Sequence, residues 1–163
     1  MASLNVMKQT ILLTLALSLS LTTLLAQSPI LKDGLYFNAD GALFSGTATL
    51  EVTENGKTLK QYIEVKDGLL DGQMKYYHSK GYVEETGNYS HGKKEGVWIQ
   101  FASNGQQLGE AYYKNGLKDG IWTVWDEQGV KRYHMVYSMG KKVDTWKMWD
   151  ENSVLVSERF YNE

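Results

Sequence analysis

Glycine and tryptophan recur in this sequence at a fixed step of 24 residues. A constant period is typical of repeat architectures, in which each unit is one supersecondary element that packs on its neighbours. The period therefore predicts an array of similar units. The residues that define the repeat are Gly68, Gly92, Gly116 and Gly140; Gly72, Gly96 and Gly120; Gly81, Gly105 and Gly129; and Trp98, Trp122 and Trp146.

Each unit is predicted to be a β-hairpin. Residues 97–101 are rich in β-branched and aromatic side chains, and residues 107–113 form the return strand. Between them, Ser103-Asn104-Gly105 suits a type I turn followed by a residue at positive φ, which Gly adopts without steric cost. A helix is disfavoured because glycines recur at short intervals and the apolar residues lack a 3.6-residue period.

The aromatic residues form further columns at the same step. Side chains alternate between two faces along a strand, so Trp98 and Phe101 should point to opposite faces. We therefore expect two stacked ladders and a separate tyrosine column: Met74, Trp98, Trp122 and Trp146; Tyr77, Phe101, Trp125 and Trp149; and Tyr89, Tyr113, Tyr137 and Tyr161. The predicted fold class is all-β, an elongated single-layer antiparallel sheet of repeated β-hairpins with about 24 residues per repeat.

Composition divides the chain near Ala26. Residues 1–26 contain no aromatic residue, no Gly and one charge, Lys8, which precedes an apolar run over residues 11–26. This pattern predicts a cleaved signal peptide over residues 1–26, a short linker over 27–33 and the repeat domain over 34–163. An uncleaved membrane anchor is the alternative, which the short, Ser- and Thr-containing run disfavours. We expect an exported protein, periplasmic or extracellular.

Charge and residue usage narrow the classes of function. Without residues 1–26, the chain carries 16 basic against 19 acidic residues, which argues against nucleic-acid binding. The sequence has no Cys, so it offers no thiol nucleophile, thiolate metal site or disulfide. Its three His residues, His78, His91 and His134, occupy different repeat positions and predict no metal or catalytic site. We expect no cofactor.

Adjacent carboxylates are candidate hydrolytic groups. Glycoside hydrolysis needs two carboxylates that face one sugar across a cleft. The pairs Asp126-Glu127 and Asp150-Glu151 lie where strands enter turns, and there an Asp side chain hydrogen-bonds the turn backbone. Glu84 and Glu85 are neighbours on one strand and should face opposite sides. The sequence therefore predicts a protein that is not an enzyme.

Two sets of residues could form a binding surface. Lys94, Lys118 and Lys142 share one column, and a basic stripe of this kind can meet anionic lipid head groups. Solvation of the turns and protection of the sheet edge are the simpler role for these lysines. Trp125 and Trp149 could stack against sugar rings, although aromatic residues also supply most of the burial available in a thin sheet.

The units resemble MORN repeats. The resemblance rests on Tyr89-Ser-His-Gly92-Lys-Lys-Glu-Gly96-Val-Trp98 and Tyr113-Lys-Asn-Gly116-Leu-Lys-Asp-Gly120-Ile-Trp122, and it covers roughly residues 34–163. The sequence is most similar to the bacterial variant of that family that carries an antitoxin label. The resemblance implies a β-hairpin array that acts as an interaction scaffold without a cofactor or a reaction.

Four functions follow, in order of preference. The first is an exported, non-catalytic scaffold that binds another protein or a cell-envelope component through its repeats. The second is a carbohydrate-binding module with exposed Trp and Tyr rows, and an anionic-lipid-binding surface ranks below it. A hydrolase that uses the turn carboxylates ranks last. A row of exposed rings among polar neighbours would favour sugar, and a broad apolar patch would favour protein.

The signal peptide gives the first testable prediction. Cleavage after Ala26 should leave a mature protein that begins at or near Gln27. Amino-terminal sequencing of the protein recovered from its host checks this. Recovery of the full-length chain in the membrane fraction would support the anchor instead.

Overall fold

The structure is a computed structural model that describes residues 28–54 and 57–162. The proposed signal peptide lies outside the described residues. The described part contains twelve β-strands. They are β1 (Ile30–Lys32), β2 (Leu35–Phe37), β3 (Gly46–Glu54), β4 (Lys57–Lys66), β5 (Leu69–His78), β6 (Val83–Ser90), β7 (Lys93–Phe101), β8 (Gln107–Lys114), β9 (Leu117–Trp125), β10 (Lys131–Ser138), β11 (Lys141–Trp149) and β12 (Leu155–Tyr161).

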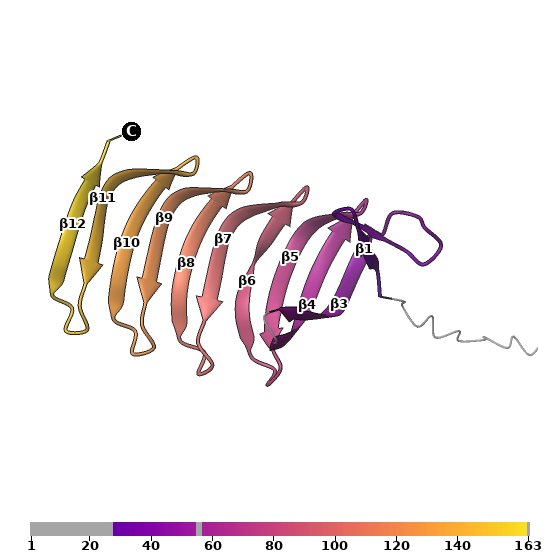
Figure 1. Ribbon diagram of the computed structural model, residues 1–163, viewed down its shortest axis with the longest axis horizontal. Coiled ribbons are helices and arrows are strands. Elements are labelled where there is room, and N and C mark those ends of the chain that lie inside the picture. Colours follow the sequence, from indigo (N-terminus) through magenta and orange to yellow (C-terminus); the bar gives the residue numbers. More distant parts are fainter. Residues whose placement is uncertain (1–27, 55–56, 163) are drawn as a thin grey trace, which may run out of the picture.

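Strands β3 to β12 form one open antiparallel sheet. The ten strands lie side by side in sequence order, and each pairs with the strands before and after it. Figure 1 shows this succession of curved strands, with the hairpin turns gathered along two opposite borders of the sheet. The fold-class prediction of an elongated antiparallel sheet of repeated hairpins is confirmed.

One border of the sheet carries two-residue turns. Ser90 pairs with Lys93 and leaves His91-Gly92 as the turn, with φ of 49° and 78°. Positive φ at both positions defines a type I′ turn, whose twist matches that of the flanking strands. The second position is Gly in each such turn because this residue takes positive φ without a Cβ clash. The equivalent turns are Asp67-Gly68, Asn115-Gly116 and Met139-Gly140.

These turns also join successive hairpins. The Gly92 amide donates to the Leu70 carbonyl over 2.8 Å, Gly116 donates to Lys94 over 2.9 Å, and Gly140 donates to Lys118 over 2.7 Å. Each acceptor lies two strands before the strand that follows the turn. The glycine column at 92, 116 and 140 therefore fixes each hairpin to the one before it.

The opposite border carries the predicted type I turns. In residues 102–105 the Gly105 amide donates to the Ala102 carbonyl over 3.0 Å, and Gly105 has φ of 84°. Gly81 and Gly129 repeat this conformation with φ of 90° and 82°. The last hairpin has Ser153 in this place, and it adopts φ of 61°. The turn predicted from the third-position glycine is therefore confirmed.

Regular bulges shape the strands between the two borders. Each return strand holds one extra residue, because Gln100 pairs with Gly109 while Phe101 pairs with Gln107. The first strand of each hairpin, which we call the outgoing strand, has a larger irregularity. There, four residues of the outgoing strand span the same length as two residues of the strand before it. Bulges strengthen the local twist and bend a strand. The extra residues on the return strands are Glu84, Leu108, Arg132 and Val156, and the outgoing steps contain Gly72, Gly96, Gly120 and Asp144.

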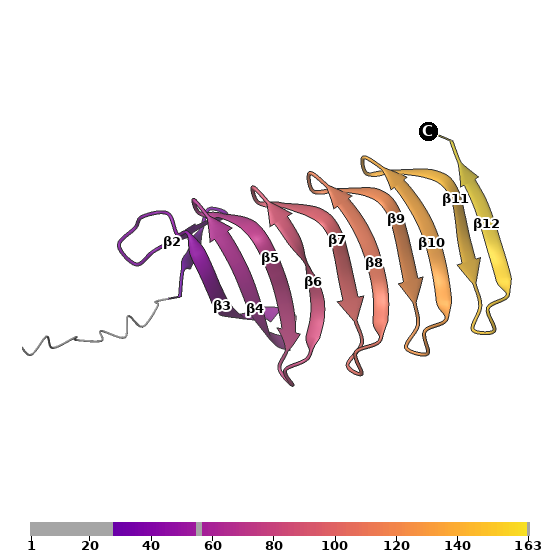
Figure 2. The same cartoon turned by 180° about the vertical axis from the view of Figure 1, so that it is seen from behind.

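A small hairpin covers the start of the sheet. Among the strands, β1 and β2 pair only with each other, and Figure 2 shows β2 beside β3 at the amino-terminal end of the array. The Tyr36 amide donates to the Gly68 carbonyl over 2.8 Å, which attaches the small hairpin to the Asp67-Gly68 turn. The segment 27–33, expected to be a linker, therefore contains strand β1.

The most buried side chains gather under this hairpin. Ile63, Val65, Met74 and Trp98 are nearly inaccessible, and Tyr36 of β2 packs against them. Burial of the side chains decreases toward the carboxyl-terminal end of the array, where β12 is exposed over nearly its whole length. The array thus has one covered end and a long, thin remainder, as expected when terminal units differ from interior ones.

Turn chemistry gives a second prediction. Met139 adopts φ of 46° at a position filled by Asn115 in the preceding hairpin, and its side chain is exposed. The left-handed conformation costs most L-residues about 1–2 kcal/mol, and Asn bears it better. We expect Met139→Asn to stabilise the protein by about 1 kcal/mol. Urea unfolding checks this, with Asn115→Met as the reverse variant, and a loss of stability in Met139→Asn would contradict it.

Candidate binding surface

One face of the sheet carries a continuous aromatic ladder. Rings from seven adjacent strands, β6 to β12, follow one another with Trp and Tyr in alternation. Successive ring centroids lie 5.2, 6.3, 5.6, 5.5, 5.1 and 5.0 Å apart, distances typical of favourable aromatic pairs. In order, the rings are Tyr89, Trp98, Tyr113, Trp122, Tyr137, Trp146 and Tyr161. We call this side of the sheet the ladder face.

The polar atoms of the ladder indoles are satisfied within the array. The indole Nε1 of Trp98 donates to the Asn88 carbonyl over 3.1 Å, and that of Trp146 donates to the Val136 carbonyl over 3.0 Å. Trp122 makes the equivalent bond to Tyr112 over 3.4 Å. Each tryptophan therefore bonds to the strand before it. These bonds help to set the orientation of each ring.

Burial also affects the tyrosines of the ladder. It raises the pKa of Tyr89 to about 12, with smaller contributions from neighbouring tyrosine and glutamate groups. Burial also raises the pKa of Tyr113 and of Tyr137. These phenols are therefore neutral well above physiological pH.

The ladder differs from the sequence prediction in its composition. Residues 24 apart lie two strands apart, which is about 9.6 Å at the usual strand spacing and too far for ring contact. The tyrosine column fills the intervening strands, so tryptophans and tyrosines form one ladder. Gly87 also contributes, because a Cβ at that position would overlap the Trp98 ring. The tryptophan and tyrosine columns are both visible in the sequence, but only strand pairing shows that their rings are in contact.

The second predicted ladder does not form as a stack. Phe101, Trp125 and Trp149 lie on the face opposite the ladder, three residues beyond Trp98, Trp122 and Trp146. Among the described residues, these three rings make no ring-to-ring contact. The reason is the strand between them, which places Gln107 beside Phe101 and Lys131 beside Trp125. Without an aromatic bridge, rings two strands apart stay separate.

The lysine column lies on the ladder. The Nζ of Lys94 is 3.6 Å from the Trp98 ring centroid and 5.2 Å from that of Tyr113. Lys118 repeats this over Trp122 and Tyr137, and Lys142 repeats it over Trp146 and Tyr161. A cation over an aromatic face is attracted by the ring quadrupole. The three lysines therefore cap the ladder, and Lys94 also meets Glu85 at 3.5 Å.

The carboxylates flanking the turns have structural partners. Asp126 Oδ1 accepts the amides of Gln128 and Val130 at 3.1 and 2.8 Å. Asp150 does the same for Asn152 and Val154, each at 2.9 Å. The turn role predicted for these two Asp residues is confirmed.

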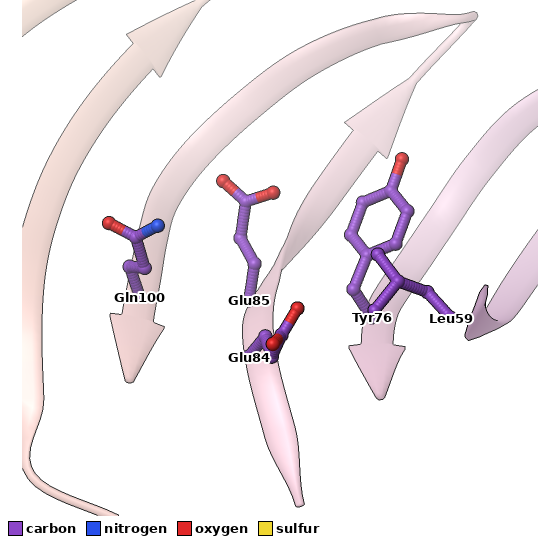
Figure 3. A pocket seen from close by; sticks show the side chains of 5 residues that line it. All are labelled: Leu59, Tyr76, Glu84, Glu85 and Gln100. Atoms are coloured by element: carbon purple, nitrogen blue, oxygen red, sulfur yellow. The ribbon is translucent and has the colours of Figure 1, made fainter. Parts of the chain in front are cut away.

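Glu84 and Glu85 depart from the prediction. Both line an open hollow of about 200 Å³ with Leu59, Tyr76 and Gln100. Figure 3 shows Glu85 between Gln100 and Tyr76, with Glu84 close by on the same strand. The expectation that the two carboxylates face opposite sides is wrong because Glu84 is the extra residue of a bulge, which breaks the alternation.

The opposite face carries an exposed apolar row that the sequence analysis missed. It consists of three cross-strand pairs: Val97 with Tyr112, Ile121 with Val136, and Thr145 with Phe160. Four of these side chains are large, apolar and more than a third exposed, and Phe160 reaches 66%. The sequence does contain a signal for this row, since Val97 and Ile121 each precede a ladder tryptophan by one residue and therefore point to the opposite face. We call these six residues the apolar row.

Two hollows lie along the apolar row, one lined in part by Gly120 and the other by Asp144. The first, of about 370 Å³, is lined by Val97, Tyr112, Gly120 and Ile121 among others. The second, of about 400 Å³, is lined by Val136, Val143, Asp144 and Phe160 with Tyr161 and Asn162. Asp144 is the repeat equivalent of Gly120, but the first hollow lies over strands β7 to β9 and the second over strands β10 to β12.

The described residues hold neither a metal-binding group nor a membrane-spanning helix. Within residues 28–54 and 57–162, no cluster of three His, Asp or Glu side chains could bind a metal ion. The same described part of the chain has no helix long and apolar enough to cross a membrane.

Comparison with known proteins adds no relative. No protein-family model matches this chain, and no curated protein is detectably similar to it in sequence.

The ladder gives a third prediction. Trp98 is 2% exposed and packs between two tyrosines, so Trp98→Ala should destabilise the fold by about 3–5 kcal/mol. Trp146 is only half-buried and lies in the last hairpin of the described array, so Trp146→Ala should cost less. Urea unfolding measures both losses.

Trp125→Ala is the control for the ladder prediction, because its ring lies on the opposite face outside the ladder. Its loss should be smaller than that of Trp98→Ala. Equal and negligible losses for all three variants would refute the role of the ladder as the core.

Proposed function

We propose that this chain is an exported, non-catalytic repeat scaffold that binds another protein through the apolar row. The observation that carries the proposal is the distribution of apolar residues between the two faces. The aromatic side chains of the ladder face are packed in the ladder and capped by lysines. The opposite face exposes Val97, Tyr112, Ile121 and Phe160.

An exposed apolar line of this kind favours a protein partner over a sugar. Contiguous apolar patches on soluble proteins mark interaction sites, and they lose water when a partner covers them. Branched aliphatic side chains such as Val97 and Ile121 pack well against apolar side chains, but they offer no flat surface or hydrogen bond to a sugar. The row also crosses several hairpins, which suits the extended binding surfaces of repeat proteins.

Other features support a non-catalytic role and the proposed family. Asp126 and Asp150 hold turn amides, and Glu85 pairs with Lys94. The succession of hairpins, the type I′ glycines and the tryptophan column agree with membership of the MORN-like group that the sequence resembles. A position outside the cytosol follows from the proposed signal peptide.

A carbohydrate-binding role is the second candidate. Trp125 and Trp149 lie on the same face as the apolar row, outside the ladder. The Nζ of Lys131 lies between them in the sheet, 6.0 Å from the Trp149 ring centroid. Rings next to a polar hydrogen-bond donor are suited to sugars. Oligosaccharide binding lost in Trp125→Ala but kept in Ile121→Asp would favour this candidate.

Photo-cross-linking tests the protein-binding proposal. A photoreactive amino acid is placed at Ile121, which is 56% exposed, and in a matched variant at Ile30, which is 55% exposed on strand β1. Irradiation of cells that make each variant should join a distinct protein at position 121 and not at position 30. Cross-links at neither position, or equal cross-links at both, would contradict the proposal.

A further inference from the structure

A hollow of about 510 Å³ opens between the small hairpin and the start of the sheet. Leu31 of β1 and Tyr36 of β2 line one side of it, and Leu50 and Val52 of β3 line another. Sites that bind small molecules have volumes of roughly 300–1,000 Å³, so this hollow is large enough for such a ligand. It is separate from the apolar row, which begins at β7.

The walls of the hollow are mainly apolar. Leu31 is 60% exposed, and Leu50 and Val52 are only half-buried. The side chain of Tyr36 is buried and closes the hollow toward the core. Apolar walls that stay in contact with water favour a ligand that displaces this water with an apolar surface of its own. The body of the ligand is therefore apolar.

One polar atom of a buried side chain faces this hollow. Gln61 of β4 is 7% exposed, and its side-chain nitrogen donates to the Tyr76 hydroxyl over 3.2 Å and to the Met74 sulfur over 3.8 Å. Within the described residues, no donor reaches the Gln61 Oε1. The same part of the chain has no fully buried side-chain oxygen without a partner. The Gln61 Oε1 is therefore open to the hollow that Gln61 lines.

The charge of the lining disfavours an anion. Of the described residues that line the hollow, only Glu51 is charged, and it is acidic. The Gln61 Oε1 is an acceptor and does not donate. A ligand that covered this oxygen with apolar atoms alone would leave it unpaired, which costs free energy. The ligand must therefore bring a hydrogen-bond donor and no negative charge.

We infer that this hollow binds a small apolar molecule that carries one hydrogen-bond donor and no negative charge. The apolar body of the ligand lies against Leu31, Leu50 and Val52, and its N–H or O–H group donates to the Gln61 Oε1. This inference goes beyond the proposed binding of a protein, because it concerns the covered end of the array and a different class of ligand.

Three matched probes test the chemistry of the ligand. N-phenyl-1-naphthylamine is neutral and apolar, has one N–H donor, and fluoresces strongly in apolar surroundings. 1-Benzylnaphthalene has a methylene group in place of that N–H, and 8-anilinonaphthalene-1-sulfonate adds a negative charge to the first skeleton. Fluorescence titration of the protein with N-phenyl-1-naphthylamine should show saturable binding. By displacement of this probe, 1-benzylnaphthalene should bind about fivefold more weakly and the sulfonate at least about tenfold more weakly.

Variants at two neighbouring positions of β1 locate the site. Leu31 lines the hollow, whereas Ile30, which is 55% exposed, does not. Leu31→Glu should weaken binding of N-phenyl-1-naphthylamine by about tenfold or more, because it brings a carboxylate against an apolar ligand. Ile30→Glu is the matched control and should leave binding unchanged. In Gln61→Leu, the preference for N-phenyl-1-naphthylamine over 1-benzylnaphthalene should disappear, because the accepting oxygen is gone.

Several outcomes would overturn the inference. Equal affinity for the three probes would remove the roles of the donor and of the charge. Binding that survives Leu31→Glu, or that Ile30→Glu weakens equally, would exclude the hollow as the site. Binding that Ile121→Asp abolishes would assign the probe to the apolar row. Absence of binding would reject the small-molecule site and leave the protein-binding proposal standing, since cross-linking at position 121 tests that proposal separately.

Discussion

The structure depends on the way that a single-layer sheet buries apolar surface. A sheet without a second layer cannot enclose a core between two faces, so burial must arise between side chains of neighbouring strands on one face. Here Trp and Tyr alternate strand by strand from β6 to β12. The centroids of successive rings lie at most 6.3 Å apart. The lysines then cover these rings with their alkyl chains and charges. Each tryptophan depends on the tyrosines of the strands beside it.

This arrangement gives the two faces different roles. The ladder face uses its large side chains internally, and its tryptophan N–H groups bond to backbone carbonyls of the preceding strand. The opposite face shares the same strands but carries Val97, Ile121 and Phe160 in the open. Alternation along a strand makes this separation automatic, because a residue next to a ladder tryptophan must point away from the ladder. The opposite face can therefore change without disturbing the packed rings.

The sequence predicted the hairpins, the turns and the single sheet, because glycine positions and β-rich runs are local signals. Gly105 required a particular turn, and that turn placed residues 97–101 against residues 107–113. The sequence did not predict which columns would meet. The contact between Trp98 and Tyr113 depends on register, and register in turn depends on bulges such as that at Leu108. The bulge at Glu84 likewise brought Glu84 and Glu85 to one hollow against the rule of alternation.

The candidate surface was predicted less well than the fold. For Lys94, Lys118 and Lys142 the sequence offered a solvated turn or a basic stripe, because sequence alone does not show that a ring lies beneath each ammonium group. Trp125 and Trp149 are conspicuous in the sequence as large aromatic residues, whereas the apolar row combines ordinary side chains such as Val97 and Ile121. These two residues lie beside Tyr112 and Val136 only through cross-strand pairing.

The hydrogen bonds of the type I′ turns give the array a direction. Each of these glycine amides donates to a carbonyl of the hairpin before it, as Gly116 does to Lys94. The acceptor of each such bond therefore belongs to a hairpin nearer the amino terminus. Such an array can be assembled in chain order, with every formed hairpin serving as the template for the next one.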